Sequence, residues 1–230
     1  MKTIGLLGGM SWESTQIYYR LINERIRDRL GGLHSARLVL YSVDFDDIER
    51  LQRAGDWDRA GALLAQAAQR LEAAGADFLV ICTNTMHRVA ADIEAATQIP
   101  LLHIADATAH AINAGGYGTV GLLGTRFTME QEFYKGRLTD RHGIRVLTPS
   151  AAEQEQAHRI IYDELCLGIV SEASRIEYLR IVDGLAREGA QAVILGCTEI
   201  GMLLQQTHCD IPLFDTTAIH AESAADVALQ

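Results

Sequence analysis

The sequence predicts an α/β fold of two pseudo-symmetric domains, each with a parallel sheet, and an active site in the cleft between them. Apolar strands and amphipathic helices alternate along all 230 residues. Three segments of the first half recur in the second, with shifts of 116, 114 and 112 residues, which indicates a duplicated unit of about 110 residues. The matching pairs are residues 3–8 with 119–124, Gly75–Ala76 with Gly189–Ala190, and residues 99–101 with 211–213.

The duplication also predicts domain boundaries. The first domain is expected to comprise residues 1–103 together with 213–230, and the second domain residues 104–212. Ligands of parallel α/β sheets lie at the carboxyl ends of the strands. Four strand-to-helix junctions are expected there, at Gly8, Thr83, Gly124 and Cys197.

The first half alternates strands and helices. Ser14 can lie in the first turn of a helix that follows the Gly8–Gly9 turn. The acidic segment 44–49 favours a helix N-terminus over a metal site, and Gly75 can end the Ala-rich helix that precedes it. The expected elements are strand 3–8, a helix to about Leu30, strand 36–43, a helix from Asp44, helix 57–74, strand 78–81, helix 85–96 and a strand from Ile99.

The second half repeats this order. Gly115–Gly116 and Gly168 mark positions where helices can end. The expected elements are helix 106–114, strand 119–123, helix 128–138, strand 144–147, helices 153–168 and 171–188, strand 192–195, helix 198–206, strand 211–214 and helix 215–229. Because strands and helices alternate throughout, each half is expected to hold a parallel sheet.

Composition argues against several classes of function. The formal net charge of −10 disfavours nucleic acid or an acidic membrane surface as the main partner, although a small anionic ligand stays possible. No apolar run reaches the length of a membrane span, and the N-terminal apolar stretch has no cleavage site of a signal peptide. Cysteines 82, 166, 197 and 209 have neither metal-ligand spacing nor a disulfide framework, so we expect a reduced, cytoplasmic protein without a metal.

The chemistry is expected at two junctions that the repeat superposes. Cys197 follows strand 192–195, and the shift of 114 places Thr83 at the equivalent position. A helix N-terminus favours a thiolate, which is the form that acts as base or nucleophile, although a buried cysteine can also be a small apolar residue. Thr83 could cap a helix, but its alignment with Cys197 makes it a candidate reacting group. The two side chains are expected to face each other across a substrate.

Three neighbouring positions leave alternatives open. Cys82 would point to the opposite face of its strand from Thr83 and is expected in the core. His87 lies about one helical turn after Thr83, where it could orient a neighbouring group or be a surface histidine. The turn at Gly8–Gly9 could offer backbone N–H groups to an anion or be a plain βα turn, because no Rossmann or P-loop motif is present.

Three motifs together resemble the aspartate/glutamate racemase family of amino-acid racemases that do not use pyridoxal phosphate. The stretch Gly5–Thr15, followed by Tyr18–Tyr19, is similar to the N-terminal signature of the family. Asn84–His87 is similar to its first catalytic motif and Gly196–Ile200 to its second. The resemblance covers nearly the whole chain and is strongest to enterobacterial members described as acting on aspartate, glutamate or a broad range of amino acids. It implies an isomerase that needs no cofactor and works as a homodimer.

The resemblance also implies residue roles. The family uses two cysteines on opposite faces of the substrate α-carbon, one to remove the α-proton and the other to return one. Cys197 would deprotonate the L-isomer, and Thr83 stands where most of the family has cysteine. Because a hydroxyl delivers a proton more readily than it abstracts one, we expect the reaction to run chiefly from the L-isomer. His87 and Glu199 would tune the reacting side chains. The expected substrate-binding residues are Gly9, Met10, Ser11, Asn84, Thr85, Thr128, Thr198 and Glu199.

Three functions compete. The first is racemisation of aspartate, glutamate or other polar amino acids. The range could include homoserine, because aspartate-specific relatives carry a lysine where Cys166 stands. The second is decarboxylation or cis-trans isomerisation of a small dicarboxylate on the same fold. The third is amino-acid binding with little catalysis, with Thr83 as a trace of lost activity. The two catalytic motifs together favour the racemase.

Overall fold

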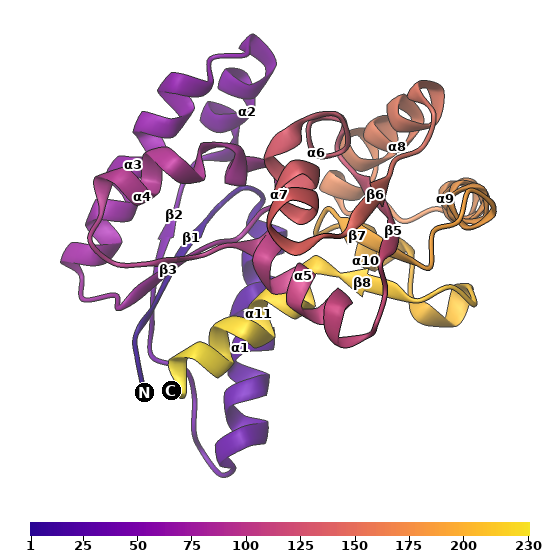
Figure 1. The fold of residues 1–230 in the computed structure, drawn as a ribbon. Coiled ribbons are helices and arrows are strands. Elements are labelled where there is room, and N and C mark those ends of the chain that lie inside the picture. The colour runs from indigo at the N-terminus through magenta and orange to yellow at the C-terminus, as the bar shows by residue number, and fades with distance from the viewer. The chain divides into compact units, whose positions relative to one another are not determined.

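The computed structural model describes residues 1–230 and consists of two compact units (Figure 1). Unit 1 comprises Met1–Ile104 and His220–Gln230, and unit 2 comprises Ala105–Ile219. The sequence predicted that the chain returns to the first domain at residue 213. The structure places this return at His220, because the last strand pairs with the sheet of unit 2.

Unit 1 holds a four-stranded parallel sheet in the order β2-β1-β3-β4. The register pairs Leu7 with Ile81 and Gly8 with Ser42, so the carboxyl ends of three strands lie side by side. The Gly8–Gly9 turn and the Thr83 loop therefore leave the same edge of the sheet. The strands are β1 (Ile4–Gly8), β2 (Leu38–Ser42), β3 (Phe78–Ile81) and β4 (Leu101–Leu102).

The helices of unit 1 begin and end near the expected residues. Asp44 and Asp56 accept backbone N–H groups of the helices they precede, and Gly75 adopts a φ of +92° just after the third helix. The expected helix 85–96 is divided into a 3-10 turn and a short α-helix. The elements are α1 (Trp12–Leu30), α2 (Phe45–Ala54), α3 (Trp57–Ala73), η1 (Thr85–Val89) and α4 (Ala90–Ala96).

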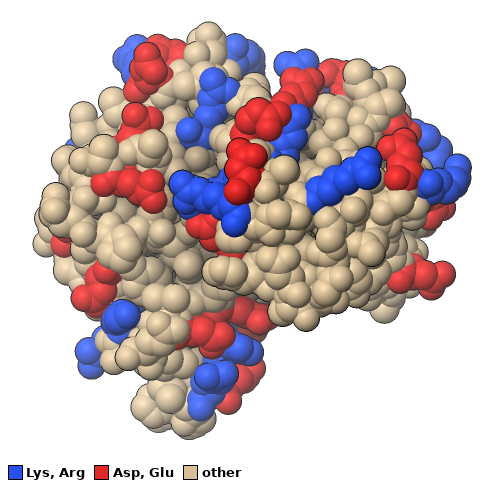
Figure 2. Space-filling model, in the orientation of Figure 1, with Lys and Arg blue, Asp and Glu red and all other residues tan.

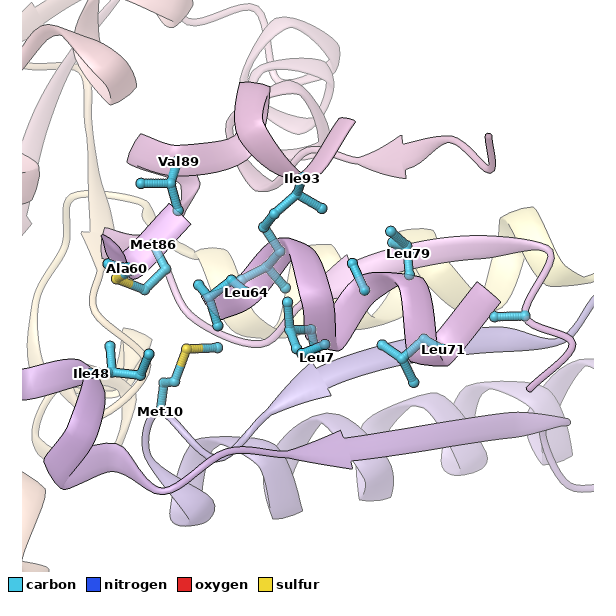
Figure 3. Close-up of a cluster of buried hydrophobic side chains, with 14 residues drawn as sticks. Leu7, Met10, Ile48, Ala60, Leu64, Leu71, Leu79, Met86, Val89 and Ile93 are labelled. Carbon is cyan, nitrogen blue, oxygen red and sulfur yellow. The ribbon is translucent and has the colours of Figure 1, made fainter. Parts of the chain in front are cut away.

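Alternation along β1 and β3 builds two apolar layers in unit 1. Leu7 and Ile81 face one cluster, which packs against α3 and η1. Leu6 and Val80 face the other cluster, which packs against α1 and the end of α11 (Thr216–Ala228). Figure 3 shows the first cluster, in which the Met10 side chain lies among core residues. Both faces of the sheet are thus covered, as expected for a parallel sheet.

Unit 2 repeats this architecture with the sheet order β6-β5-β7-β8, all parallel. Its register pairs Gly124 with Gly196 and Leu195 with Asp215. The matching strand orders confirm the predicted fold class and the duplication. The strands are β5 (Thr119–Gly124), β6 (Arg145–Leu147), β7 (Ala192–Gly196) and β8 (Leu213–Asp215).

The helices of unit 2 differ from the prediction in three places. The expected helix 128–138 is two helices separated at Gln131, and the expected helix 153–168 ends early and continues as a 3-10 turn. The expected helix 198–206 is only four residues long. The elements are α5 (Ile104–Ala114), α6 (Arg126–Glu130), α7 (Glu132–His142), α8 (Ala151–Asp163), η2 (Leu165–Leu167), α9 (Glu172–Arg187), α10 (Ile200–Leu203) and η3 (Gln206–His208).

The two halves of the chain exchange their last helices. α5 follows β4 of unit 1, yet its residues from Ala105 belong to unit 2. α11 follows β8 of unit 2, yet its residues from His220 belong to unit 1. Arg137 in α7 forms an ion pair with Asp106 of α5, with an N–O distance of 2.6 Å. The sheet of unit 1 is therefore covered on one side by a helix from the other half of the sequence, and α5 packs within unit 2.

Charged side chains of both signs are interspersed on the face shown in Figure 2. Ion pairs such as Arg20–Glu24 and Arg53–Glu49 join residues one helical turn apart on exposed surfaces. Such pairs contribute little to stability. None of the helices combines the length and the apolar character needed to cross a bilayer.

Candidate active site

Cys197 lies immediately after β7, at the carboxyl edge of the sheet of unit 2. Its side chain is 8% exposed, and its Sγ lies 3.0 Å from Oε2 of Glu199. Thr198 donates its hydroxyl to the same oxygen over 2.5 Å. Glu199 is itself only 5% exposed. The Gly-Cys-Thr-Glu segment therefore folds into a compact group in which one carboxylate accepts from both a thiol and a hydroxyl.

The expected effect of a helix N-terminus on Cys197 is wrong in direction. Burial raises the pKa of the thiol well above its ordinary value, and the Glu199 charge raises this pKa further. α10 begins only at Ile200 and spans one turn, so its dipole is too short to offset desolvation. The resting form of Cys197 is accordingly the thiol, with Glu199 as the acceptor of its hydrogen bond.

Two further groups surround Cys197 within unit 2. Tyr178 of α9 and Cys166 of η2 both interact electrostatically with the thiol. The Tyr178 hydroxyl donates to the backbone oxygen of Ala157 over 3.0 Å, and burial raises the pKa of this phenol. The sequence does not indicate that Cys166 or Tyr178 lies near Cys197, because no local motif marks a tyrosine in the middle of a helix.

Thr83 lies at the equivalent position in unit 1, directly after Cys82, and is partly exposed. Cys82 points to the opposite side and packs in the apolar cluster with α1, as predicted. Burial raises the pKa of the Cys82 thiol. Of these two neighbours, only Thr83 is open to a ligand.

His87 is buried beneath the Thr83 loop, so the alternative of a surface histidine is wrong, and an orienting role stays a prediction. Its Nδ1–H donates to the backbone oxygen of Thr83 over 2.8 Å. Its Nε2 accepts the backbone N–H of Ile104 over 3.2 Å. Burial lowers the pKa of His87 well below its ordinary value, and the nearby imidazoles of His103 and His220 lower it further. The ring is therefore neutral, and both of its nitrogens are engaged.

Ser11 and Thr125 occupy matching places after β1 and β5. Ser11 caps α1 by accepting the N–H of Ser14, and the two hydroxyl oxygens lie 3.2 Å apart. Thr125 caps α6 by accepting the N–H of Thr128, again with hydroxyl oxygens 3.2 Å apart. The sequence analysis selected Ser11 and Thr128 but missed their partners, Ser14 and Thr125. The same shift of 114 residues relates both members of each pair, so the repeat was the signal that could have found them.

The expected binding residues differ in what they expose. Met10 buries its side chain in the core of unit 1, so only its backbone can contact a ligand. Gly9 donates its N–H to Thr15 over 2.8 Å, and a Cβ at Gly9 would meet the backbone of Val43 at 2.2 Å. Thr128 is fully buried. Its methyl group would lie 3.3 Å from a Cβ at Gly196, so its side chain packs against the end of β7.

The expected residues divide between the two units. Unit 1 brings Thr83 and His87 together through a hydrogen bond, and Asn84 and Thr85 are buried next to them. Unit 2 brings Cys197, Thr198 and Glu199 together. No group of three or more His, Cys, Asp or Glu side chains is arranged to hold a metal ion. The chemistry that these groups offer is proton transfer by a thiol next to a carboxylate in one unit, and a hydroxyl on a positioned loop in the other.

Comparison with known proteins gives a consistent result. The model of the Asp/Glu/hydantoin racemase family matches residues 7–224. The broad specificity amino-acid racemase RacX of Bacillus subtilis (strain 168) is 23% identical over 236 aligned residues, which cover 98% of this chain and 98% of RacX. A candidate Asp/Glu racemase from Yersinia pestis has a solved structure that matches with a TM-score of 0.94 and 59% identity over 100% of both chains. An aspartate racemase homologue from Pyrococcus horikoshii OT3 matches with a TM-score of 0.87 and 33% identity, also over 100% of both chains.

Proposed function

Because the chain belongs to the Asp/Glu/hydantoin racemase family and has the fold of its racemases, we propose that it interconverts L- and D-amino acids without a cofactor. The proposed reaction removes the α-proton of the substrate on one face and returns a proton on the other. The observation that carries the proposal is the Cys197–Glu199 pair, a buried thiol whose proton has a carboxylate acceptor 3.0 Å away.

Cys197 is proposed as the base for the L-isomer. The buried thiol must first lose its proton, and Glu199 is the group that can accept it. The ammonium group of a bound amino acid would favour the thiolate, because an opposite charge within a few ångström lowers a thiol pKa. The thiolate then takes the α-proton, and a carbanionic intermediate remains. Thr198 helps to hold the Glu199 carboxylate in place through its 2.5 Å hydrogen bond.

Thr83 is proposed to serve the opposite face of the α-carbon. Its hydroxyl, or a water molecule that it holds, would deliver the proton that completes the inversion. A hydroxyl is a far weaker base than a thiolate, so abstraction from the D-isomer on this face is expected to be slow. The proposal therefore includes a kinetic preference for the L-isomer as substrate.

The proposed substrates are aspartate and glutamate, with a wider range that includes homoserine. The family description and the Pyrococcus horikoshii homologue support the acidic amino acids, and the similarity to RacX supports a broader range. Ser11, Asn84, Thr85 and Thr198 are the proposed binding residues that contribute polar side chains. We also propose that the enzyme acts as a homodimer in the cytoplasm, which sedimentation and fractionation would test.

Deuterium exchange at Cα in D₂O tests this proposal. The wild-type enzyme should incorporate deuterium into at least one L-amino acid, and Cys197→Ser should lose this exchange because a serine hydroxyl is a much weaker base. Cys209→Ser is the matched control, since its thiol lies at the loop before β8 with Sγ 3.6 Å from the backbone oxygen of Ile211. Unchanged exchange in Cys197→Ser would refute the assigned base, and absence of exchange from every amino acid would refute the racemase.

A further inference from the structure

Three buried histidines and one tyrosine form a connected group in unit 1 on the inner side of the Thr83 loop. The ring of His87 contacts the ring of His103 with centroids 4.5 Å apart, and the ring of His220 with centroids 5.7 Å apart. The ring of His220 in turn meets the edge of Tyr18 at 5.6 Å. These side chains come from η1, the end of β4, α11 and α1, so the group joins four separate parts of unit 1.

Hydrogen bonds fix the orientation of the His220 ring. Its Nε2 lies 2.8 Å from the backbone oxygen of Leu102, which can only accept, so Nε2 carries the proton. Its Nδ1 lies 2.8 Å from the Tyr18 hydroxyl and must then accept from it. Burial lowers the pKa of His220 to about 4, so the ring is neutral and this tautomer persists at neutral pH. The Leu102 carbonyl therefore selects the tautomer of His220, and the Tyr18 hydroxyl holds the ring in place by donating to its other nitrogen.

The segment Leu102–Ile104 is held from both sides by imidazoles. His220 binds the carbonyl of Leu102, and His87 accepts the N–H of Ile104. The other nitrogen of His87 donates to the carbonyl of Thr83. A continuous path of hydrogen bonds and ring contacts thus runs from Tyr18 through His220 and the 102–104 segment to His87 and the Thr83 loop.

We propose that Tyr18 and His220 are positioning residues for Thr83: they hold the segment that fixes His87, and His87 holds the backbone of the Thr83 loop. This inference rests on the proposed function, because it assigns the group to the face where Thr83 would return the proton. Neither Tyr18 nor His220 is proposed to contact the substrate. A displacement of the Thr83 hydroxyl by about 1 Å is enough to slow proton delivery by up to ~10²-fold.

The predicted signature is a change in the partition of the intermediate. Proton return from Cys197, after its thiol has exchanged with solvent, gives deuterated L-isomer. Delivery on the Thr83 face gives the D-isomer. The initial ratio of D-isomer formed to deuterated L-isomer does not depend on the amount of folded enzyme, because both products come from the same active molecules. A variant that only destabilises the protein therefore leaves this ratio unchanged.

The experiment measures this ratio by proton NMR and chiral chromatography for wild type, Tyr18→Phe and a matched control. Tyr134→Phe is the control, because Tyr134 is a fully buried tyrosine of unit 2 whose hydroxyl donates to Thr108 Oγ1 over 3.4 Å. Tyr18→Phe should lower the ratio severalfold, and Tyr134→Phe should leave it unchanged. His220→Gln retains an amide donor for Leu102 and should keep a higher ratio than His220→Phe.

Two results would overturn the inference. If Tyr18→Phe and His220→Phe both keep the wild-type ratio, the histidine group is purely structural, while the racemase proposal stands. If Tyr18→Phe and Tyr134→Phe lower the ratio equally, the effect is not specific to the Thr83 face. A failure of the proposed function is distinguishable from both, because the wild-type enzyme would then show no Cα exchange at all.

Discussion

At Cys197, burial and a neighbouring negative charge act on the thiol pKa in the same direction. The thiol is nearly excluded from solvent and lies next to a carboxylate, and both conditions raise its pKa. A base in this position is inactive at rest and requires a proton acceptor. In the proposed mechanism Glu199 is this acceptor, and its Oε2 contacts both the Cys197 thiol and the Thr198 hydroxyl. A thiol that stays protonated until substrate binds would also resist oxidation, since oxidants react with the thiolate.

Glu199→Gln separates the two effects of the carboxylate. The variant keeps the shape of the side chain but removes its charge, so the pKa of the Cys197 thiol should fall. Mass-resolved alkylation of Cys197 as a function of pH should therefore shift to lower pH than in wild type. Cα exchange should nevertheless decrease by roughly 10²–10⁴-fold, the range typical of a lost acid–base group.

The expected fall in the thiol pKa and the expected fall in the exchange rate distinguish the two roles of Glu199. A lower thiol pKa alone would speed exchange by increasing the amount of thiolate. If Glu199→Gln exchanges protons as fast as wild type or faster, Glu199 is not the acceptor of the thiol proton. Glu188→Gln, at the exposed end of α9, is the control for a loss of surface charge.

At the scale of elements, the packing of α11 against α1 and the end of β4 depends on a neutral imidazole. His220 is fully buried, and burial lowers its pKa to about 4. The groups that face it are the Tyr18 hydroxyl, the carbonyl of Leu102 and the imidazole of His87, whose own pKa is lowered. None of them offers a negative charge that would stabilise a protonated ring.

Unfolding should therefore become easier in mild acid. In the unfolded chain a histidine binds its proton near pH 6.5, whereas folded His220 binds it only near pH 4. Its contribution is complete above pH 6.5 and is lost as the pH falls from 6.5 to about 4, in total on the order of 3 kcal/mol. Urea unfolding across this range measures the loss.

Comparison with His220→Phe isolates this effect. The variant should show a smaller decrease in unfolding free energy between pH 6.5 and pH 4 than wild type, because one of the buried neutral histidines has been removed. His34→Gln, at an exposed position, should behave as wild type. Parallel pH curves for wild type and His220→Phe would show that His220 does not titrate differently in the folded state.

At the scale of the whole molecule, much of the architecture was visible in the sequence. The repeated segments predicted two parallel sheets, and the strand orders β2-β1-β3-β4 and β6-β5-β7-β8 confirm them. The exchange of α5 and α11 was anticipated only in part. The return of the chain was placed at residue 213 and not at His220, because strand pairing is set by contacts distant in sequence.

The sequence indicates which candidate residues follow a strand end, but it does not indicate how burial changes their pKa values or their hydrogen bonds. Thr83 and Cys197 are candidate reacting groups because the repeat superposes them. The raised pKa of the Cys197 thiol was not predicted, because it depends on burial and on surrounding groups such as Tyr178 and Cys166. The hydrogen bonds of both His87 nitrogens were likewise not predicted, because the partner Ile104 is distant in sequence. That Thr83 and Cys197 act on one substrate stays a prediction.

The exchanged helix makes unit 1 depend on the C-terminal segment. Residues 220–230 contribute Ala221, Ala224, Ala225 and Ala228 to the apolar cluster on one face of the sheet, and Lys2 donates its N–H to the Ala228 carbonyl over 2.8 Å. A chain that ends at Ile219 exposes this face. It should unfold at a clearly lower temperature, or in separate steps for the two units, when followed by circular dichroism. Removal of Gln230 alone should have little effect, and an unchanged melting curve for the longer deletion would refute this dependence.

The proposed racemase transfers protons with a strong base on one face of the substrate α-carbon and a weak base on the other. Proton NMR in D₂O tests it most directly, with L- and D-isomers of aspartate, glutamate and homoserine supplied separately. We expect fast Cα exchange from the L-isomer, through Cys197, and slow exchange from the D-isomer. Equal rates from both isomers would mean that Thr83, or a water that it holds, is as competent a base as Cys197, and would refute the proposed asymmetry.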